Sequence, residues 1–301
     1  MTLVQAIFMG IIQGLTEFLP VSSSGHLALF KILFGVKTDT GMLFDVLLHV
    51  GTLAAICTVY YRDIAKLFVE GLCIVRDVIL NIGIFFRNCF SKASGRRSGG
   101  EAVFLPYRRI VSNGYRKFVL LILVSTIPTG VIGYVGKNVV EQASEILLVP
   151  GICLILTGVL LLIADHAKEG EKLPKNVTYS NAFLIGISQG VATLPGLSRS
   201  GTTITACLIS GFNRKFAVKY SFIMSIPAIL GAMVLELKDF TPAAVPGLEI
   251  SYYAVGMVIA AVLGYICIKT MLFIVKKQKF TGFAIYCFII GAVSIGGFFF
   301  L

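Results

Sequence analysis

The feature that most constrains the fold of this chain is a series of apolar runs, each about 20 residues long, the length an α-helix needs to cross a bilayer. The runs cover residues 42–61, 118–136, 146–164, 216–236, 252–274 and 281–300. Charged residues make up only 14% of the 301 residues, against about 25% in soluble domains. The sequence therefore predicts an all-α polytopic membrane protein with a single integral membrane domain, residues 1–301.

Two further apolar regions, residues 2–35 and 180–211, are each interrupted midway by a stretch rich in Pro, Gly and Ser. Each half has room for a helix of only about a dozen residues, which is too short to cross a bilayer. Interrupted helices are tolerated at membrane depth where their backbone is buried in protein or lines a wet cavity. We therefore expect two re-entrant helical hairpins in addition to six transmembrane helices.

The basic residues are unevenly distributed, and this predicts the orientation. With six crossings, most of the 26 Lys and Arg residues fall on one side, most densely in residues 62–117. The positive-inside rule places that side in the cytoplasm and both termini outside, so the net charge of +11 needs no nucleic-acid partner. We expect residues 64–90 to lie on the cytoplasmic surface as an amphipathic segment, and the basic insertion 87–109 to form a solvated loop.

The two interrupted regions are related by an internal repeat. Residues 10–25, "GIIQGLTEFLPVSSSG", align without gaps with residues 186–201, "GISQGVATLPGLSRSG". Three predicted spans follow each hairpin, and an odd number of crossings inverts the second half relative to the first. We therefore expect an inverted-topology repeat, with repeat 1 at about 1–164 and repeat 2 at about 180–301, whose interrupted segments meet near the middle of the membrane.

The two breaks also concentrate polar side chains where water is scarce. They carry Gln13, Glu17, Ser22, Ser23, Ser24 and His26 in the first hairpin, and Ser198, Arg199, Ser200, Thr202 and Thr203 in the second. An ionisable group at membrane depth is costly, so Glu17 and Arg199 are expected to pair across the repeat. Each break opens a helix, and two helix N-termini beside an arginine favour a phosphate-like anion. Serine N-caps alone are the plainer alternative, but they leave Glu17, His26 and Arg199 unexplained.

At this point the motifs resemble those of a known family. "QGLTEFLPVSSSGH" (13–26) and "LPGLSRSGTT" (194–203) are similar to the two signatures of undecaprenyl-diphosphate phosphatases, the bacitracin-resistance membrane family. Agreement extends to "FDVLLHVGTLAA" (44–55), "FAVKYSFIMSIPAILGA" (216–232) and "FAIYCFIIGA" (283–292), and thus to nearly the whole chain.

The resemblance implies a phosphoric anhydride hydrolase of the bacterial plasma membrane. Its substrate would be a C55 polyprenyl diphosphate, cleaved at an outward-facing site to the monophosphate and inorganic phosphate. This reaction recycles the lipid carrier of peptidoglycan synthesis and confers bacitracin resistance. Inverted repeats are also a transporter architecture, so a polyprenyl-phosphate flippase, alone or in addition, is the alternative. The sequence leaves the oligomeric state open, a homodimer included.

The resemblance also assigns residue roles by position. It implies a catalytic core of Glu17, Ser23, His26 and Arg199, surrounded by the substrate-binding residues Gln13, Ser22, Ser24, Ser198, Ser200 and Thr203. A divalent cation, Mg²⁺ or Ca²⁺, is implied as well, held mainly by the diphosphate with Glu17 as a candidate ligand. We expect Ser23 to attack the terminal phosphorus with Glu17 or His26 assisting proton transfer, and His26 is the rival nucleophile.

Two positions depart from the family pattern. Gln13 stands where many relatives have Glu, which makes a metal bound directly by the protein less certain. His49 replaces a usual Gln, and it is expected to form an i, i+4 pair with Asp45 that supports the structure or the site rather than catalysing the reaction.

Overall fold

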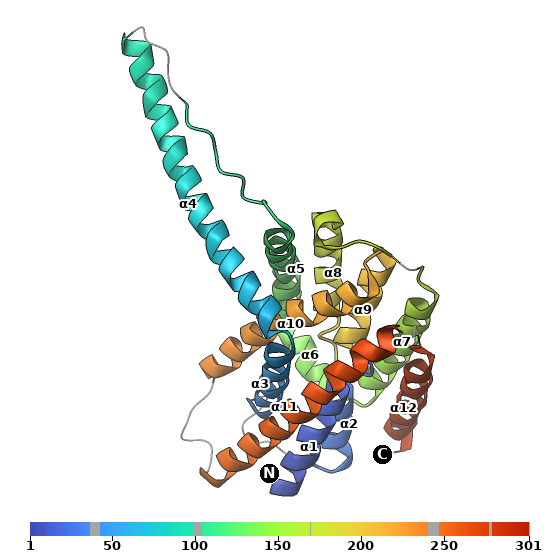
Figure 1. Ribbon diagram of the computed structural model, residues 1–301. Coiled ribbons are helices and arrows are strands. Elements are labelled where there is room, and N and C mark those ends of the chain that lie inside the picture. The colour runs from blue at the N-terminus through green and yellow to red at the C-terminus, as the bar shows by residue number, and fades with distance from the viewer. Residues whose placement is uncertain (37–42, 99–103, 169, 240–246, 277–278, 301) are drawn as a thin grey trace.

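The computed structural model describes residues 1–36, 43–98, 104–168, 170–239, 247–276 and 279–300, and over these residues the chain is helical with no strand. The helices follow in chain order (Figure 1): α1 (Leu3–Thr16), α2 (Ser23–Leu33), α3 (Leu43–Val59), α4 (Tyr61–Ser98), α5 (Gly114–Val135), α6 (Lys137–Ser144), α7 (Leu148–His166), the 3₁₀ turn η1 (Pro174–Asn176), α8 (Tyr179–Val191), α9 (Arg199–Ile209), α10 (Arg214–Asp239), α11 (Gly247–Lys276) and α12 (Thr281–Phe300).

Five helices of the described residues are long and apolar enough to cross a membrane: α5, α7, α12, Arg214–Leu235 of α10 and Ile250–Val275 of α11. The remaining predicted span, 42–61, corresponds to α3, an apolar helix of 17 residues, and its residue 42 lies outside the described part. The predicted polytopic all-α class is therefore confirmed. Since many large apolar side chains on these helices are exposed, their outer faces suit contact with lipid.

The two interrupted regions form helical hairpins, as the sequence predicts. The first hairpin consists of α1 and α2, with 14 and 11 residues, and the second of α8 and α9, with 13 and 11 residues. Both breaks contain a residue with positive φ, Ser22 at 69° and Gly196 at 91°. The left-handed conformation of Ser22 is uncommon for a residue with a side chain, and it turns the chain directly into α2.

Small residues let each hairpin pack closely on a long helix. α1 lies along α11, where a Cβ added to Gly14 would come 2.7 Å from Cβ of Leu263. α8 lies along α5, where a Cβ added to Gly190 would come 2.7 Å from Cβ of Ile132. Close approach of backbones through glycine is a common way for helices to associate in membranes. The two hairpins thus use matching glycines of the repeat in the same way.

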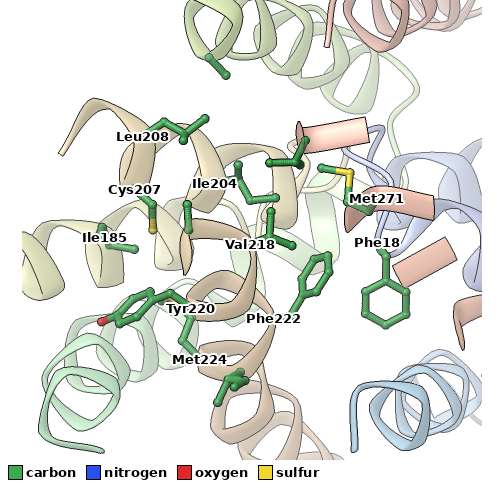
Figure 2. Close-up of a cluster of buried hydrophobic side chains, with 14 of the residues drawn as sticks. Phe18, Ile185, Ile204, Cys207, Leu208, Val218, Tyr220, Phe222, Met224 and Met271 are labelled. Atoms are coloured by element: carbon green, nitrogen blue, oxygen red, sulfur yellow. The ribbon is translucent and has the colours of Figure 1, made fainter. Parts of the chain in front are cut away.

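A buried apolar cluster packs the hairpins against α10 and α11 (Figure 2). Phe18 of the first break packs edge-on against Phe222 of α10, with ring centroids 5.2 Å apart. Ile204 of α9 and Met271 of α11 belong to the same cluster. Since Phe18 directly follows Glu17, this packing fixes the backbone that carries the buried carboxylate.

The α4 segment differs from one of the two expectations for it. α4 is one helix of 38 residues that covers 64–90 and projects beyond the rest of the molecule (Figure 1), and the surface location of 64–90 stays a prediction. Residues 87–98 of the insertion continue this helix, so the predicted solvated loop is wrong for them, while 99–103 lie outside the described part.

Asparagine side chains on α4 explain why the chain returns beside the helix. Asn88 donates from Nδ2 to the carbonyl of Leu105 (3.0 Å) and accepts from its N–H (2.9 Å), and Asn81 pairs with Arg108 in the same way. These bonds satisfy backbone groups of an extended segment that has no neighbouring strand. The segment following residue 103 is therefore ordered along α4.

Arg116, in the first turn of α5, joins the projecting α4 helix, which we call the arm, to the rest of the molecule. Its guanidinium donates from Nη1 to Asp77 (2.7 Å) and from Nε to Glu70 (2.9 Å). These hydrogen bonds lower the pKa of both carboxyl groups below their ordinary values, because they favour the charged forms.

Candidate active site

The candidate site is built around the buried carboxylate of Glu17. Glu17 ends α1, and its carboxylate accepts from Gln13 Nε2 (2.9 Å) and Ser23 Oγ (2.5 Å), both at Oε2. Its Oε1 forms an ion pair with Nη2 of Arg199. The predicted meeting of Glu17 and Arg199 across the two hairpins is therefore present in the structure.

The first hairpin presents Ser23 to this carboxylate through the geometry of its helix start. Ser22 is the N-cap of α2, where its Oγ accepts from the N–H of Gly25 (3.2 Å) and lies 3.3 Å from Oγ of Ser24. Ser23 is the first helical residue, and its hydroxyl points away from this capping pair toward Glu17. Ser22 and Ser24 therefore shape the helix start, whereas the Ser23 hydroxyl contacts the buried carboxylate.

The second hairpin repeats the same cap. Ser198 is the N-cap of α9, accepts from the N–H of Gly201 (3.1 Å) and lies 3.3 Å from Ser200. The N–H of Ser198 donates to Thr157 of α7 (2.9 Å), which fixes where α9 begins. Arg199 is the first helical residue of α9, so it occupies the position that Ser23 has in α2.

Thr203 is buried between α9 and α10. Its side chain is fully buried, and its Oγ1 lies 2.6 Å from Oγ of Ser221 on α10 and donates to the carbonyl of Arg199 (2.8 Å). These contacts hold α9 against α10 and support the backbone of Arg199.

His26 lies outside the carboxylate cluster. Its Nδ1 is 2.7 Å from the carbonyl of Ser22, which can only accept, so a neutral ring carries its hydrogen there. Its Nε2 is 2.8 Å from the hydroxyl of Tyr286 on α12, and the two rings are stacked 5.6 Å apart. Both ring nitrogens of His26 are therefore engaged away from Ser23, and its contribution to proton transfer there stays a prediction.

His49 takes the place beside Glu17 instead. Its Nε2 lies 3.6 Å from Oε2 of Glu17, while Nδ1 is 2.7 Å from the backbone carbonyl of Asp45. The carboxylate of Asp45 pairs with Lys31 at 2.5 Å, so the expected side-chain pair of Asp45 and His49 is not formed. One signal for this residue is visible in the sequence, an ionisable side chain within an apolar helix, but its partner is not.

Access to the cluster is from one edge. The Glu17 side chain is only 4% exposed, whereas those of Arg199 and His49 are 21% and 29% exposed. A ligand would therefore meet Arg199 and His49 first and reach Glu17 behind them. The first-turn N–H groups of α2 and α9 add donors, since helix starts leave such groups without intrahelical partners. This arrangement can bind a phosphate group and transfer a proton next to it.

The long apolar helices define this chain as a polytopic membrane protein, in which two interrupted hairpins share a carboxylate–guanidinium pair. The chain belongs to the family described as bacitracin resistance protein BacA, whose model matches residues 6–293.

The chain is also similar along its length to curated relatives named undecaprenyl-diphosphatase. It is 38% identical to the protein of Alkaliphilus metalliredigens over 98% of both chains, and 36% identical to that of Methanosphaera stadtmanae over 97% of both. It is 40% identical to the protein of Treponema denticola over 97% of this chain and 96% of the relative.

Proposed function

We propose that this protein hydrolyses undecaprenyl diphosphate to undecaprenyl phosphate and inorganic phosphate. The observation that carries the proposal is the hydrogen bond of 2.5 Å between Ser23 and Glu17, next to the cationic Arg199. The names of the relatives supply the substrate class. In a bacterial cell the product would return to peptidoglycan synthesis, and this recycling accounts for resistance to bacitracin.

The reaction follows from the positions of three side chains. Arg199 has five N–H donors, so it can hold a phosphate while it stays near Glu17. As Ser23 Oγ attacks the terminal phosphorus, Glu17 takes its proton. The bond from that phosphorus to the bridging oxygen breaks, and the electron pair leaves with the polyprenyl monophosphate. Water then attacks the phosphoryl group on Ser23, the bond from phosphorus to Oγ breaks, and Glu17 returns its proton to Oγ as inorganic phosphate leaves.

The choice of Ser23 over His26 as the nucleophile rests on their different surroundings. The Ser23 hydroxyl contacts a carboxylate that can accept its proton, whereas His26 Nε2 is occupied by Tyr286. His26 and Tyr286 would instead form one wall of the entrance to the site, because both side chains are partly exposed.

The surroundings of Glu17 fit a divalent cation that the substrate carries in. Gln13 Oε1 is buried with no hydrogen-bond partner among the described residues, and its Nε2 binds Glu17. Amide and carboxylate oxygens are ligands that Mg²⁺ and Ca²⁺ accept, so Gln13 and Glu17 would hold the ion beside the diphosphate. Within the described residues no group of three or more His, Cys, Asp or Glu could do so alone. When bound, the ion would neutralise phosphate charge.

The same proposal includes the topology. Both chain termini lie at the end of the molecule opposite to the projecting α4 (Figure 1), which supports termini outside and the basic segment 62–117 in the cytoplasm. Matching contacts of α1 with α11 and of α8 with α5 support an inverted repeat of 1–164 and 180–301. The site would open outward from the middle of the membrane.

A test uses the purified protein in detergent with undecaprenyl diphosphate and Mg²⁺. We expect release of inorganic phosphate that Glu17→Gln slows by about 10²–10⁴-fold and that His166→Gln, a change at the far end of α7, leaves intact. In proteoliposomes, movement of the lipid across the bilayer without phosphate release would contradict the proposal and support the flippase instead.

A further inference from the structure

The α4 arm carries an apolar stripe that nothing in the described chain covers. Its six apolar side chains are between 51% and 68% exposed, and an exposed cysteine continues the line. We call this stripe the seam, and its members are Phe68, Leu72, Val75, Ile79, Ile82, Phe86 and Cys89. Large apolar side chains in contact with water are unfavourable, so such a stripe marks an interaction surface.

The spacing of the seam indicates what kind of partner covers it. Successive members are alternately four and three residues apart, which is the heptad pattern of a coiled coil. Leu72, Ile79 and Phe86 take the a positions, and Phe68, Val75, Ile82 and Cys89 the d positions. The pattern holds for three heptads, or about 33 Å of helix at about 1.5 Å per residue. A strict repeat of this kind fits another helix better than a flat surface.

The opposite face of α4 already has its partner. Leu67, Ile74, Asp77 and Asn88 are buried, and Asn88 and Asp77 bind the returning segment and Arg116. The seam is therefore the side of the arm that remains for intermolecular contact.

A second copy of this chain satisfies the geometry. Two copies in one membrane have the same orientation, so a two-fold axis along the membrane normal relates them, and α4 projects from both bodies in the same direction along this axis. In a parallel pair each g position faces an e position of the other helix. The facing pairs are Val78 with Gly83, Phe85 with Phe90, and Gly71 with Arg76. None of these pairs joins like charges.

We propose that the α4 arms of two copies form a parallel coiled coil through the seam, so that the protein is a dimer held together on its cytoplasmic side. The proposal is independent of the catalytic roles given above. It has a built-in reporter, because Cys89 occupies a d position and meets its counterpart across the two-fold axis. The cytoplasm keeps thiols reduced, so Cys89 marks the contact without bonding it in the cell.

The test is oxidative cross-linking in isolated membranes. In a Cys57→Ser/Cys73→Ser background, we expect copper phenanthroline to convert the protein to a covalent dimer on a denaturing gel. Ile79→Asp should abolish the dimer, whereas the matched variant Leu80→Asp, one residue off the seam, should keep it. Moving the thiol off the seam by Cys89→Ser/Arg87→Cys should also abolish it. Equal thermal unfolding midpoints of the two aspartate variants check that both fold.

Two outcomes overturn the proposal. If the protein stays monomeric after oxidation while Cys89 reacts freely with a maleimide, the seam has no partner. If Cys89 is shielded from maleimide yet does not cross-link, a membrane surface or another protein covers the seam in place of a second copy.

Discussion

The two hairpins have the same construction but opposite chemistry. Each begins its second helix with a serine N-cap, and the two capping serine pairs have the same separation of 3.3 Å. The charged and reactive groups are not repeated. Glu17 of the first hairpin aligns with Thr193 of the second, and Ser23 of the first aligns with Arg199 of the second.

This difference shows why the site needs both halves. Either hairpin alone would leave one charge at membrane depth without its counter-ion, which is strongly unfavourable. Together, Glu17 and Arg199 neutralise each other and lie next to two helix N-termini. In the proposed reaction, the repeated scaffold thus supplies position, and unlike residues at equivalent places supply the chemistry.

The largest effect on turnover should come from Ser23, which aligns with Arg199 of the second hairpin. Ser23→Ala removes the nucleophile, and turnover should fall by up to about 10⁶-fold, as when a nucleophile that acts with its base is deleted. His26→Ala should reduce turnover much less, because its ring contacts Tyr286 and not Glu17. Trapping of labelled phosphoenzyme from a radioactive diphosphate checks this, and an acid-labile label on histidine would reverse the assignment.

The next effect concerns the cation of the second hairpin. Arg199→Ala should lower kcat/KM by about 10³–10⁵-fold, since arginine stabilises charge on a transferring phosphoryl group. Arg199→Lys should recover part of this loss, because it restores charge but not the fork of donors. Phosphate release measured over a range of substrate concentrations gives kcat/KM for both variants. Equal kcat/KM of Arg199→Lys and the wild type would contradict a contact that uses several donors of the guanidinium.

A third prediction compares equivalent positions directly. Glu17→Gln should lower kcat by about 10²–10⁴-fold, the usual contribution of a positioned base. Thr193→Val changes the aligned residue, whose hydroxyl donates to the carbonyl of Gly190, and should leave kcat unchanged. Comparable losses in the two variants would mean that the hairpins share the chemistry more evenly than their residues indicate.

The smallest effect should be the same in both hairpins. Gly14→Ala and Gly190→Ala each place a Cβ 2.7 Å from a neighbouring side-chain carbon, on Leu263 and Ile132 respectively. Each should destabilise the fold by about 1–3 kcal/mol through overpacking. Gly130→Ala is the matched control, because its Cβ would meet nothing within 4 Å. Thermal unfolding in detergent measures all three, and a loss confined to one hairpin would show that the packing is not equivalent.

Much of the site could be predicted because its information is local. The aligned motifs placed Glu17 and Arg199 in equivalent breaks, and opposite charges at membrane depth have few alternatives to pairing. The serine caps followed from the same motifs, since an N-cap is decided within one helical turn.

The remaining contacts depend on packing between distant elements. His26 meets Tyr286, 260 positions away, and His49 approaches Glu17 only because α3 lies near the first hairpin. The α4 arm was mispredicted for a related reason. Its amphipathic period is visible in the sequence, but Asn81 and Asn88 show their role only once the returning segment lies beside them.

A double-mutant cycle between Glu17 and Arg199 tests most directly whether the two hairpins form one site. The kcat/KM for phosphate release is measured for the wild type, Glu17→Gln, Arg199→Lys and the double variant. If the two residues act as a unit, the double variant should lose about as much as the more damaging single change. If the two losses multiply, as they do for independent positions, the residues act separately and the shared site is contradicted.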